Sequence, residues 1–556
     1  MKHSITLLLT LCIAVIYTVR VSAQQSVQND DPVVEKIIEL ANADNRTMQH
    51  LDVMCNRFGG RLLGSAAYED AAKWAVAMFR EWGLEASLEY AGELPVGFNR
   101  GPWFGRMIGG NGRTLHFTTP SYTAGTKGVQ RGTVVREPYT TAEFERMKGT
   151  VKNAWVLVGG DSRGWPIDYT PLADEQRAEI IAHNDETERK NAEIRRRNYE
   201  IMYRRHELER EIAAETNPKI KARKEAELEA AKPEELLPLK REPGLFYKQM
   251  REAGMLGVIQ SATVPITTLY DRKNIDSMTW ETLPVLPDIK LDEEQFKVIE
   301  AMVDRGEYFQ LEFDIRNHFR MGPVPYHSVV AVLRGEEFPD EYVICCGHLD
   351  CYDVATGGVD CGTGIAPTIE AARLLAQAGA RPKRSIMFCL WAGEEFGLLG
   401  SKYWVEHNTD KLPNIINLFN RDGGPTVAES MSVPQEWYDD MVPVCAPLAN
   451  LNPDFPFTLS VGKHYPTERP TRPGGSDHAY FALNGVPTIS FGTGDPKGYN
   501  FNYMEIWHTE RDLYNKSIPE YMEHTSIVNA VVLWGMANME RRLPADAVYK
   551  PAKQQE

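Results

Sequence analysis

The sequence predicts an α/β fold whose mixed, largely parallel central sheet is covered by helices on both faces. From Tyr326 onward, short apolar segments alternate with longer segments of helical periodicity. The apolar segments are rich in Val, Ile and Phe along their whole length, which is typical of strands buried on both faces. Turns containing Gly and Asp follow several of them, as expected where the strands of such a sheet end. A smaller β-rich domain that carries a charged helical hairpin is expected to interrupt this fold.

Residues 1–23 have the pattern of a signal peptide. Lys2 precedes an apolar run from Ile5 to about Val19, and the small residues 21–23 (VSA) form a cleavage site. The run is shorter than the roughly 20 residues that a membrane-spanning helix needs. We therefore expect an exported protein, periplasmic or secreted, with no membrane span after signal cleavage.

The main domain is expected in two parts, residues 24–125 and 286–545, with a tail at 546–556. Its second part repeats a short strand, a polar turn and a helix. The expected strands are VVAVLRG, EYVICCGH, RSIMFCLWAG, NIINLFNRDG and VPTISFGTG, and the expected helices are APTIEAARLLAQAGA, GLLGSKYWVEHN and IPEYMEHTSIVNAVVLWGMANMERR. In such sheets the ligand site lies outside the carboxyl ends of the strands.

Residues 126–285 are expected to form the β-rich insert, because strand patterns such as VKNAWVLVGG flank a sharp change in composition. Within it, residues 173–242 predict a charged helical hairpin broken at Asn217-Pro218. Such charge-rich helices are more often solvated structural arms than dedicated binding arms. One seven-residue register carries the apolar residues of the first helix, with Thr187 as a polar gap: Ile180, Ile194, Ile201 and Leu208.

The composition limits the classes of function. The chain has 556 residues, 43% of them hydrophobic, so it can bury at least one large core. A formal net charge of -16 argues against nucleic acid as the main partner, because phosphate binding requires a basic surface. Eight cysteines become seven once Cys12 leaves with the signal, which is too few for a disulfide scaffold.

Potential metal ligands follow three consecutive predicted strands. His348 and Asp350 follow the first, Glu394 and Glu395 the second, and Asp422 the third. A glycine-rich turn adds Asp360, and a late loop adds His508. Each residue alone is explained by a turn, a helix cap or a hydrogen-bonded histidine. Together these nitrogen and oxygen donors suit zinc.

The number of ligands favours two metal ions. Five ligands exceed the three that a single catalytic zinc usually takes, but they fit two ions about 3.5–4 Å apart that share a carboxylate. Asp360 is the natural bridge, because the glycines around it allow a close backbone approach. In the adjacent Glu pair, one carboxylate binds metal while its neighbour is free to act as a general base.

These residues resemble the co-catalytic zinc exopeptidases, a family that includes bacterial aminopeptidases, glutamate carboxypeptidase and carboxypeptidase Q. The matching stretches are GHLD at 347–350, the Asp360-x-Gly-x-Gly turn, AGEEFGLLGS at 392–401, NRDG at 420–423 and His508. NRFGGRLLGSAAYEDAAKW at 56–74 resembles carboxypeptidase Q-like members. The resemblance covers roughly residues 326–540 and implies the zinc exopeptidase fold. The insert resembles a protease-associated domain, and residues 173–242 are additional to the usual length of such an insert.

The resemblance implies a role for each residue. His348 and Asp422 would hold one zinc, Glu395 and His508 the other, and Asp360 would bridge them. Glu394 would be the general base of peptide hydrolysis, and Asp350 would orient His348. The resemblance also covers GGSDHAYF, whose polar residues are candidate substrate contacts, although a helix cap explains them equally well: Ser476, Asp477 and His478.

Cys351 and Cys361 depart from the family pattern, since small polar or acidic residues are usual there. We expect a disulfide between them that pins Asp360; two buried free thiols, or a thiol that binds metal, are the alternatives. Two other classes of function remain open: a one-zinc glutaminyl cyclase-like acyltransferase and a non-catalytic binding module on the same fold. The expected partner is a dipeptide or short peptide, and the sequence is compatible with a homodimer.

Overall fold

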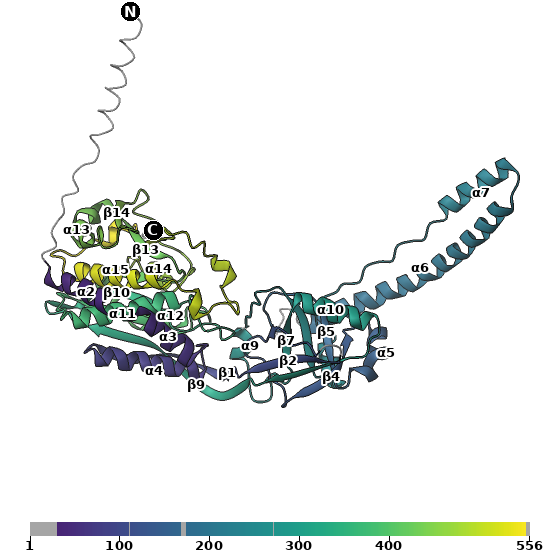
Figure 1. Ribbon diagram of the computed structural model, residues 1–556, viewed down its shortest axis with the longest axis horizontal. Coiled ribbons are helices and arrows are strands. Elements are labelled where there is room, and N and C mark those ends of the chain that lie inside the picture. The colour runs from purple at the N-terminus through teal and green to yellow at the C-terminus, as the bar shows by residue number, and fades with distance from the viewer. Residues whose placement is uncertain (1–30, 110–111, 168–173, 271, 552–556) are drawn as a thin grey trace, which may run out of the picture.

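The computed structural model describes residues 31–109, 112–167, 174–270 and 272–551 (Figure 1). The predicted signal peptide, residues 1–23, lies outside them. None of the helices in this described part combines the length and apolar character needed to cross a membrane. Two lobes are joined by the long strands β1 (Glu85–Asn99) and β9 (His318–Leu333), and a helical arm projects from the second lobe, away from the first.

The first lobe contains a five-stranded sheet in the order β1-β9-β11-β10-β12. Strand β10 pairs in parallel with β11 and β12, whereas β9 pairs antiparallel with β1 and β11. The sheet is therefore mixed with a parallel core, and the predicted mixed α/β fold is confirmed. The remaining strands of this sheet are β10 (Phe338–His348), β11 (Arg384–Trp391) and β12 (Ile415–Asn420).

Helices cover both faces of this sheet because alternate residues of each strand face opposite sides. In β10, Val343 and Cys345 belong to the core under α2, α4, α11 and α15, whereas Ile344 and Cys346 belong to the core under α12 and α14. The covering helices are α2 (Pro32–Ala43), α3 (Thr47–Asp52), α4 (Ala66–Glu81), α11 (Gly362–Gln377), α12 (Leu399–His407), α13 (Gln435–Cys445), α14 (His478–Leu483) and α15 (Pro519–Ala537).

A three-stranded sheet in the order β14-β13-β15 lies beside α13 and α15. Its strands are β13 (Val427–Val433), β14 (Thr458–Val461) and β15 (Phe491–Gly494). The described part of the predicted tail packs on this lobe: Val548 is buried, and its carbonyl accepts a hydrogen bond from the Thr467 amide. Short single-turn helices complete the lobe: η1 (Val53–Phe58), η2 (Leu412–Asn414), η3 (Ala446–Leu448), η4 (Tyr503–Glu505), η5 (Tyr514–Lys516) and η6 (Ala545–Ala547).

The second lobe is an inserted domain built on a seven-stranded sheet in the order β2-β8-β4-β5-β6-β7-β3. Its strands are β2 (Trp103–Ile108), β3 (Phe117–Thr118), β4 (Gln130–Arg136), β5 (Ala154–Ser162), β6 (Gly257–Ala262), β7 (Asp288–Asp292) and β8 (Gln310–Ile315), and its helices outside the arm are α5 (Thr141–Val151), α8 (Tyr247–Glu252) and α10 (Glu293–Asp304). Helix α9 (Arg272–Asp276), from the same stretch of chain, packs on β1 and on the core of the first lobe.

This sheet extends beyond the boundaries 126 and 285 that the composition suggested. Strands β2 and β3 precede residue 126, and β7, α10 and β8 follow residue 285. The reason is that β2 follows β1 directly, β8 leads directly into β9, and β2 and β8 pair with each other as β1 and β9 do. The chain therefore enters and leaves the insert along one continuous ribbon, without the linker that would mark a boundary in sequence.

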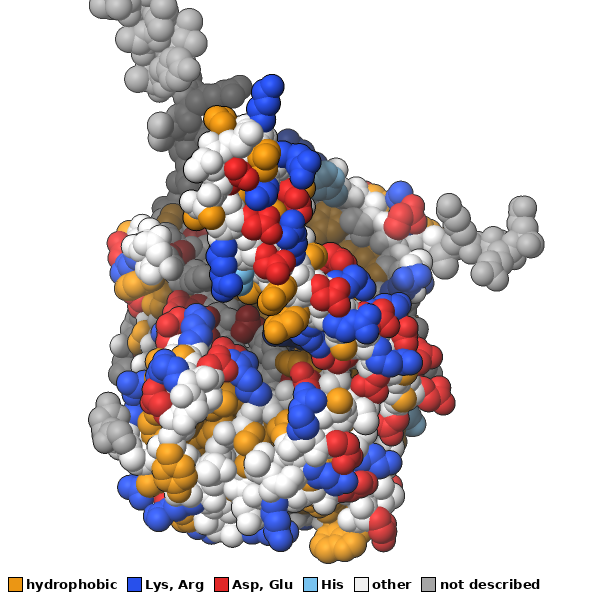
Figure 2. All heavy atoms as spheres, turned by 90° about the vertical axis from the view of Figure 1, so that its right-hand side faces the viewer, with side chains coloured by type: hydrophobic (Ala, Val, Ile, Leu, Met, Phe, Trp, Pro, Cys, Tyr) orange, Lys and Arg blue, Asp and Glu red, His pale blue; other side chains and the backbone are white. Residues whose placement is uncertain are grey.

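The arm consists of α6 (Asp174–Ala214), α7 (Pro218–Ala230) and a return segment at 231–243 that has no helix or strand. On the predicted register of α6, Thr187, Ile194 and Leu208 are buried, and Ile180 and Ile201 are half-buried. Figure 2 looks toward the arm and shows acidic and basic side chains interspersed over it.

A ladder of asparagines fastens the return segment to α6. Three asparagines of α6 lie seven residues apart. The side-chain NH₂ group of each donates to one backbone carbonyl of the return segment, and its side-chain oxygen accepts from the backbone N–H of that same residue. The six hydrogen bonds measure 2.7–2.9 Å. The pairs are Asn184 with Lys240, Asn191 with Leu237 and Asn198 with Glu234.

Candidate active site

The carboxyl ends of β10, β11 and β12 bring the predicted ligands together. His348 is the last residue of β10 and is fully buried. Its Nδ1 lies 2.9 Å from the backbone carbonyl of Asp350, which accepts a hydrogen bond from the ring. That bond directs the other ring nitrogen, Nε2, toward Asp360 Oδ1 at 3.1 Å and Asp422 Oδ1 at 3.5 Å. A histidine held in this way offers a free nitrogen to a metal.

The second histidine lies on the other side of Asp360. His508 Nε2 is 2.9 Å from Glu395 Oε2 and 3.7 Å from Asp360 Oδ2. The two oxygens of one carboxylate thus face two different histidines. Ligand atoms of Asp360, Glu395 and His508 all lie within 4.8 Å of one another, as a common metal ion requires.

Asp350 lies at the site but has a different contact from the predicted one. Its Oδ1 is 3.7 Å from His348 Nδ1, so it is the backbone carbonyl rather than the carboxylate that bonds the ring. The carboxylate accepts hydrogen bonds from the amides of Glu394 and Glu395, at 3.1 and 3.2 Å. Asp350 therefore positions the Glu pair.

The buried carboxylates of the site favour the binding of cations. Burial and the neighbouring Asp360 raise the pKa of Glu395, and burial together with Glu395 raises that of Glu394 despite the opposing effect of His348. Burial lowers the pKa of His508 to about 4, so its ring is neutral at physiological pH. A buried group of carboxylates beside a neutral imidazole is costly unless positive charge compensates it. The donor set and its charge therefore fit zinc.

The residues of GGSDHAYF lie next to this group. Asn420, at the end of β12, donates to Ser476 Oγ at 2.9 Å, and Ser476 in turn helps to keep the pKa of Asp422 low. Asp477 is fully buried and accepts from Ser401 Oγ, and burial raises its pKa to about 7. His478 begins α14 and is half-buried.

Cys351 and Cys361 are free thiols, so the expected disulfide is wrong. The two side chains have different partners: Cys351 Sγ accepts from the Arg61 amide at 3.1 Å, whereas Cys361 Sγ donates to the Arg421 carbonyl at 3.0 Å. Asp360 is instead held by Asp512, a residue that the sequence analysis missed. Its carboxylate accepts from the amides of Val359, at 2.7 Å, and Asp360, at 3.2 Å.

The inserted domain braces the loop that carries His508. The Thr268 amide donates to the His508 carbonyl at 3.2 Å, and the Glu510 amide donates to the Ile266 carbonyl at 3.1 Å. His116, also from the insert, lies 2.8 Å from Glu510 Oε2. The His508 ring is further packed against two aromatic rings that the sequence analysis did not select, with centroid distances of 4.5 Å to Tyr352 and 4.1 Å to Trp507.

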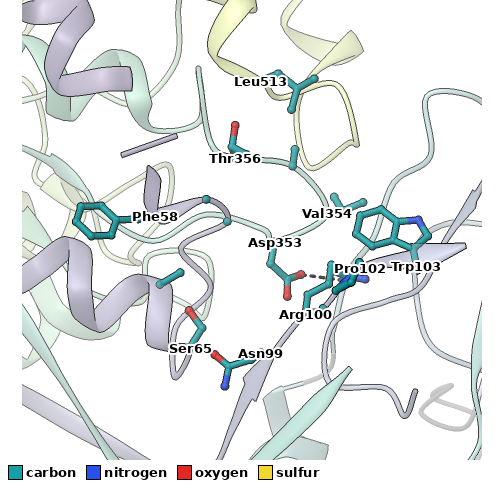
Figure 3. Close-up of a pocket in the computed structure, with 15 residues that line it drawn as sticks. Phe58, Ser65, Asn99, Arg100, Pro102, Trp103, Asp353, Val354, Thr356 and Leu513 are labelled. Carbon is teal, nitrogen blue, oxygen red and sulfur yellow. Dashed lines mark hydrogen bonds and ion pairs between the residues drawn. The ribbon is translucent and has the colours of Figure 1, made fainter. Parts of the chain in front are cut away.

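A separate pocket of about 370 Å³ lies at the junction of the lobes (Figure 3). It is bounded by the loop at 353–356 and by the start of the insert, where Arg100 forms a buried ion pair with Asp353 at 2.8 Å. None of the predicted metal ligands lines this pocket. The ligand cluster is thus a site distinct from it.

Comparison with known proteins shows what this arrangement resembles. Residues 328–533, which contain all five predicted metal ligands, match Peptidase family M28. The matched residues lie in the first lobe and make up less than half of the chain. The predicted resemblance to the co-catalytic zinc exopeptidases, close to carboxypeptidase Q, is thereby confirmed, and residues 328–533 are similar to a peptidase domain.

The chain has curated relatives and shares its fold with a solved structure. It is 26% identical over 299 residues to carboxypeptidase Q of Xenopus laevis and 24% identical over 302 residues to that of Homo sapiens, covering 53% of this chain and 59% of each relative. It therefore spans about half the length of the curated relatives it matches. A probable glutamate carboxypeptidase of Arabidopsis thaliana is 34% identical over 197 residues, 32% of this chain and 28% of the relative. The crystal structure of a peptidase M28 precursor from Shewanella amazonensis shares the fold, with a TM-score of 0.52 and 18% identity over 92% of this chain and 97% of that one.

Proposed function

We propose that the chain is an exported exopeptidase that uses two zinc ions to hydrolyse terminal peptide bonds of dipeptides or short peptides. The observation that carries this proposal is the position of Asp360, whose two oxygens face two separate histidines. The arrangement divides the ligands into two sets that share one carboxylate. His348 and Asp422 would hold one ion, and Glu395 and His508 the other.

The protein groups have defined tasks in this reaction. Bound zinc would lower the pKa of a water molecule and polarise the peptide carbonyl. Glu394 accepts the proton of the attacking water and passes it to the nitrogen of the leaving amine as the C–N bond breaks. Asp350 holds the Glu394 and Glu395 backbone so that one carboxylate is directed to a metal and the other stays free.

The remaining polar residues define where a substrate would lie. Ser476 contacts Asp422, and burial lowers the pKa of His478 while the nearby Asp422 charge opposes that shift. We propose that Ser476, Asp477 and His478 form the wall that contacts the substrate next to the metals. The match of residues 328–533 to Peptidase family M28 favours a peptidase over the acyltransferase and over the binding module.

Glu394→Gln tests the proposal. The variant keeps the shape of the side chain but cannot accept the proton, so we expect kcat to fall by about 10²–10⁴-fold, with two zinc ions still bound per chain. The matched control is Glu406→Gln on the exposed end of α12, which should retain parental activity. Parental activity in Glu394→Gln, or fewer than two zinc ions in the active parent, would contradict the proposal.

The substrate is tested with dipeptides blocked at one end. An exopeptidase must recognise a free terminus, so blocking either the amine or the carboxylate should abolish cleavage while the other block is tolerated. Cleavage of both blocked dipeptides at equal rates would exclude exopeptidase action. Mass spectrometry of the protein recovered outside the expressing cell tests export, since the expected mature chain lacks residues 1–23.

A further inference from the structure

The side chain of Cys361 lies among the predicted ligands of one metal position. Its Sγ, a ring nitrogen of His348 and a carboxylate oxygen of Asp422 all lie within 4.8 Å of one another. The Cys361 side chain is fully buried. Three potential ligand atoms of different elements, sulfur, nitrogen and oxygen, thus converge at one point beside Asp360.

The surroundings of Cys361 hold the sulfur in this place. A Cβ atom at Gly364 would come within 2.5 Å of Sγ and 2.1 Å of the Arg421 carbonyl oxygen, and one at Gly347 within 3.1 Å of both, so the two glycines leave the room that this sulfur and that oxygen occupy. The Arg421 carbonyl, 3.0 Å from Sγ, limits it on a third side. Among the described residues, the potential metal ligands grouped with this thiol are His348 and Asp422.

Cys351 provides the contrast. It is also buried and precedes Cys361 by ten residues, but its Sγ contacts the Arg61 amide. Among the described residues it belongs to neither group of potential metal ligands. Burial in this loop therefore does not by itself place a thiol at the metal position.

We propose that Cys361 provides a thiolate ligand to the metal ion held by His348 and Asp422. This inference rests on the proposed two-zinc function. On binding, the S–H bond breaks, its proton passes to solvent and a sulfur–metal bond forms, with no change in oxidation state. One metal position then has sulfur, nitrogen and oxygen donors, whereas the position of Glu395 and His508 has only nitrogen and oxygen.

Because their donor atoms differ, the two metal positions would prefer different metal ions. Thiolate prefers soft or borderline ions such as Zn²⁺ and Cd²⁺, whereas carboxylate and imidazole also accept harder ions. When Cd²⁺ is supplied at one equivalent to a two-zinc protein, it should therefore replace the zinc beside Cys361 first. The replaced zinc appears in the filtrate, and a cadmium–sulfur absorption band in the ultraviolet identifies the position.

X-ray absorption at the zinc edge is the decisive experiment. In the full chain with two zinc ions, one sulfur should appear at about 2.3 Å, longer than the roughly 2.0–2.2 Å of zinc–nitrogen and zinc–oxygen bonds. Spread over two ions, this corresponds to an average of half a sulfur per zinc. The sulfur signal should disappear in Cys361→Ser and persist in Cys351→Ser, and Cys361→Ser should bind one of its two zinc ions at least about tenfold more weakly.

The outcomes separate this inference from the proposed function. Two bound zinc ions without a sulfur neighbour in the parent protein would overturn the role of Cys361 and leave the two-zinc proposal intact. A single bound zinc would contradict the two-zinc proposal, and its sulfur signal would still decide for or against Cys361. Because the parent protein alone gives this answer, the test does not depend on the folding of Cys361→Ser.

Discussion

Replacing Asp350 tests whether this buried carboxylate positions the Glu pair. Its two oxygens accept the amides of Glu394 and Glu395, one each, at 3.1 and 3.2 Å. In Asp350→Asn one oxygen remains and an NH₂ group faces the second amide. One buried N–H group then loses its acceptor, which should lower the free energy of unfolding by about 1–3 kcal/mol.

Asp350→Ala removes both acceptors, so its cost should be about twice as large, about 2–6 kcal/mol. Urea titrations of the zinc-loaded proteins, followed by circular dichroism, measure both values. The exposed Asp410→Asn, beyond α12, is the matched control and should stay within about 0.5 kcal/mol of the parent. Both variants should also lose activity, because displacing a catalytic group by about 1 Å costs about 10²-fold. Equal stability of Asp350→Asn, Asp350→Ala and the parent would refute the positioning role.

Three further predictions concern pH, metal and the arm. Burial raises the pKa of Glu137 in the insert from 4.5 to about 7, so the folded state holds its proton more tightly. The free energy of unfolding should therefore fall by up to roughly 3 kcal/mol as pH rises from about 4.5 to 7, and Glu137→Gln should remove this slope in urea titrations at several pH values. Removing zinc with a chelator should lower the melting temperature reversibly, since each ion at 1,000 times its Kd stabilises the fold by about 4 kcal/mol; an unchanged melting temperature would contradict the ligand assignment. Replacing residues 199–232, the tip of the arm, by a short Gly-Ser loop should leave peptidase activity within about twofold, because the arm projects away from the catalytic lobe (Figure 1); a tenfold loss would show that the arm takes part.

The sequence allowed the position of the ligand cluster to be predicted because parallel strands end at a common edge. His348 ends such a strand, and Glu395 and Asp422 follow two others, so their approach to one another results from the topology. The prediction of His508 as a ligand depended on the family resemblance, because His508 comes from a loop whose position is set by backbone contacts with the insert. Asp512 could have been sought in the same loop, four residues after His508.

Other features depend on long-range contacts that no local sequence pattern indicates. The spacing of Cys351 and Cys361 suggested a bridge, yet the separate contacts of their sulfur atoms with Arg61 and Arg421 direct them apart. The limits of the insert were missed because β1 runs into β2, and β8 into β9, without a break in composition. Local sequence thus predicted the strand ends well and the long-range partners poorly.

The asparagine ladder restricts how the length of the arm can change. Seven residues of helix advance about 10.5 Å, and three residues of extended chain advance about 10 Å, so the two repeats stay in step along the arm. Removing seven residues from α6 together with three from the return segment preserves every remaining pair, whereas removing either alone shifts all pairs beyond the cut out of register. Related chains with the same ladder should therefore differ by whole units of ten residues in the part of the arm below Asn198 and Glu234, whereas the tip beyond this last pair is free to vary.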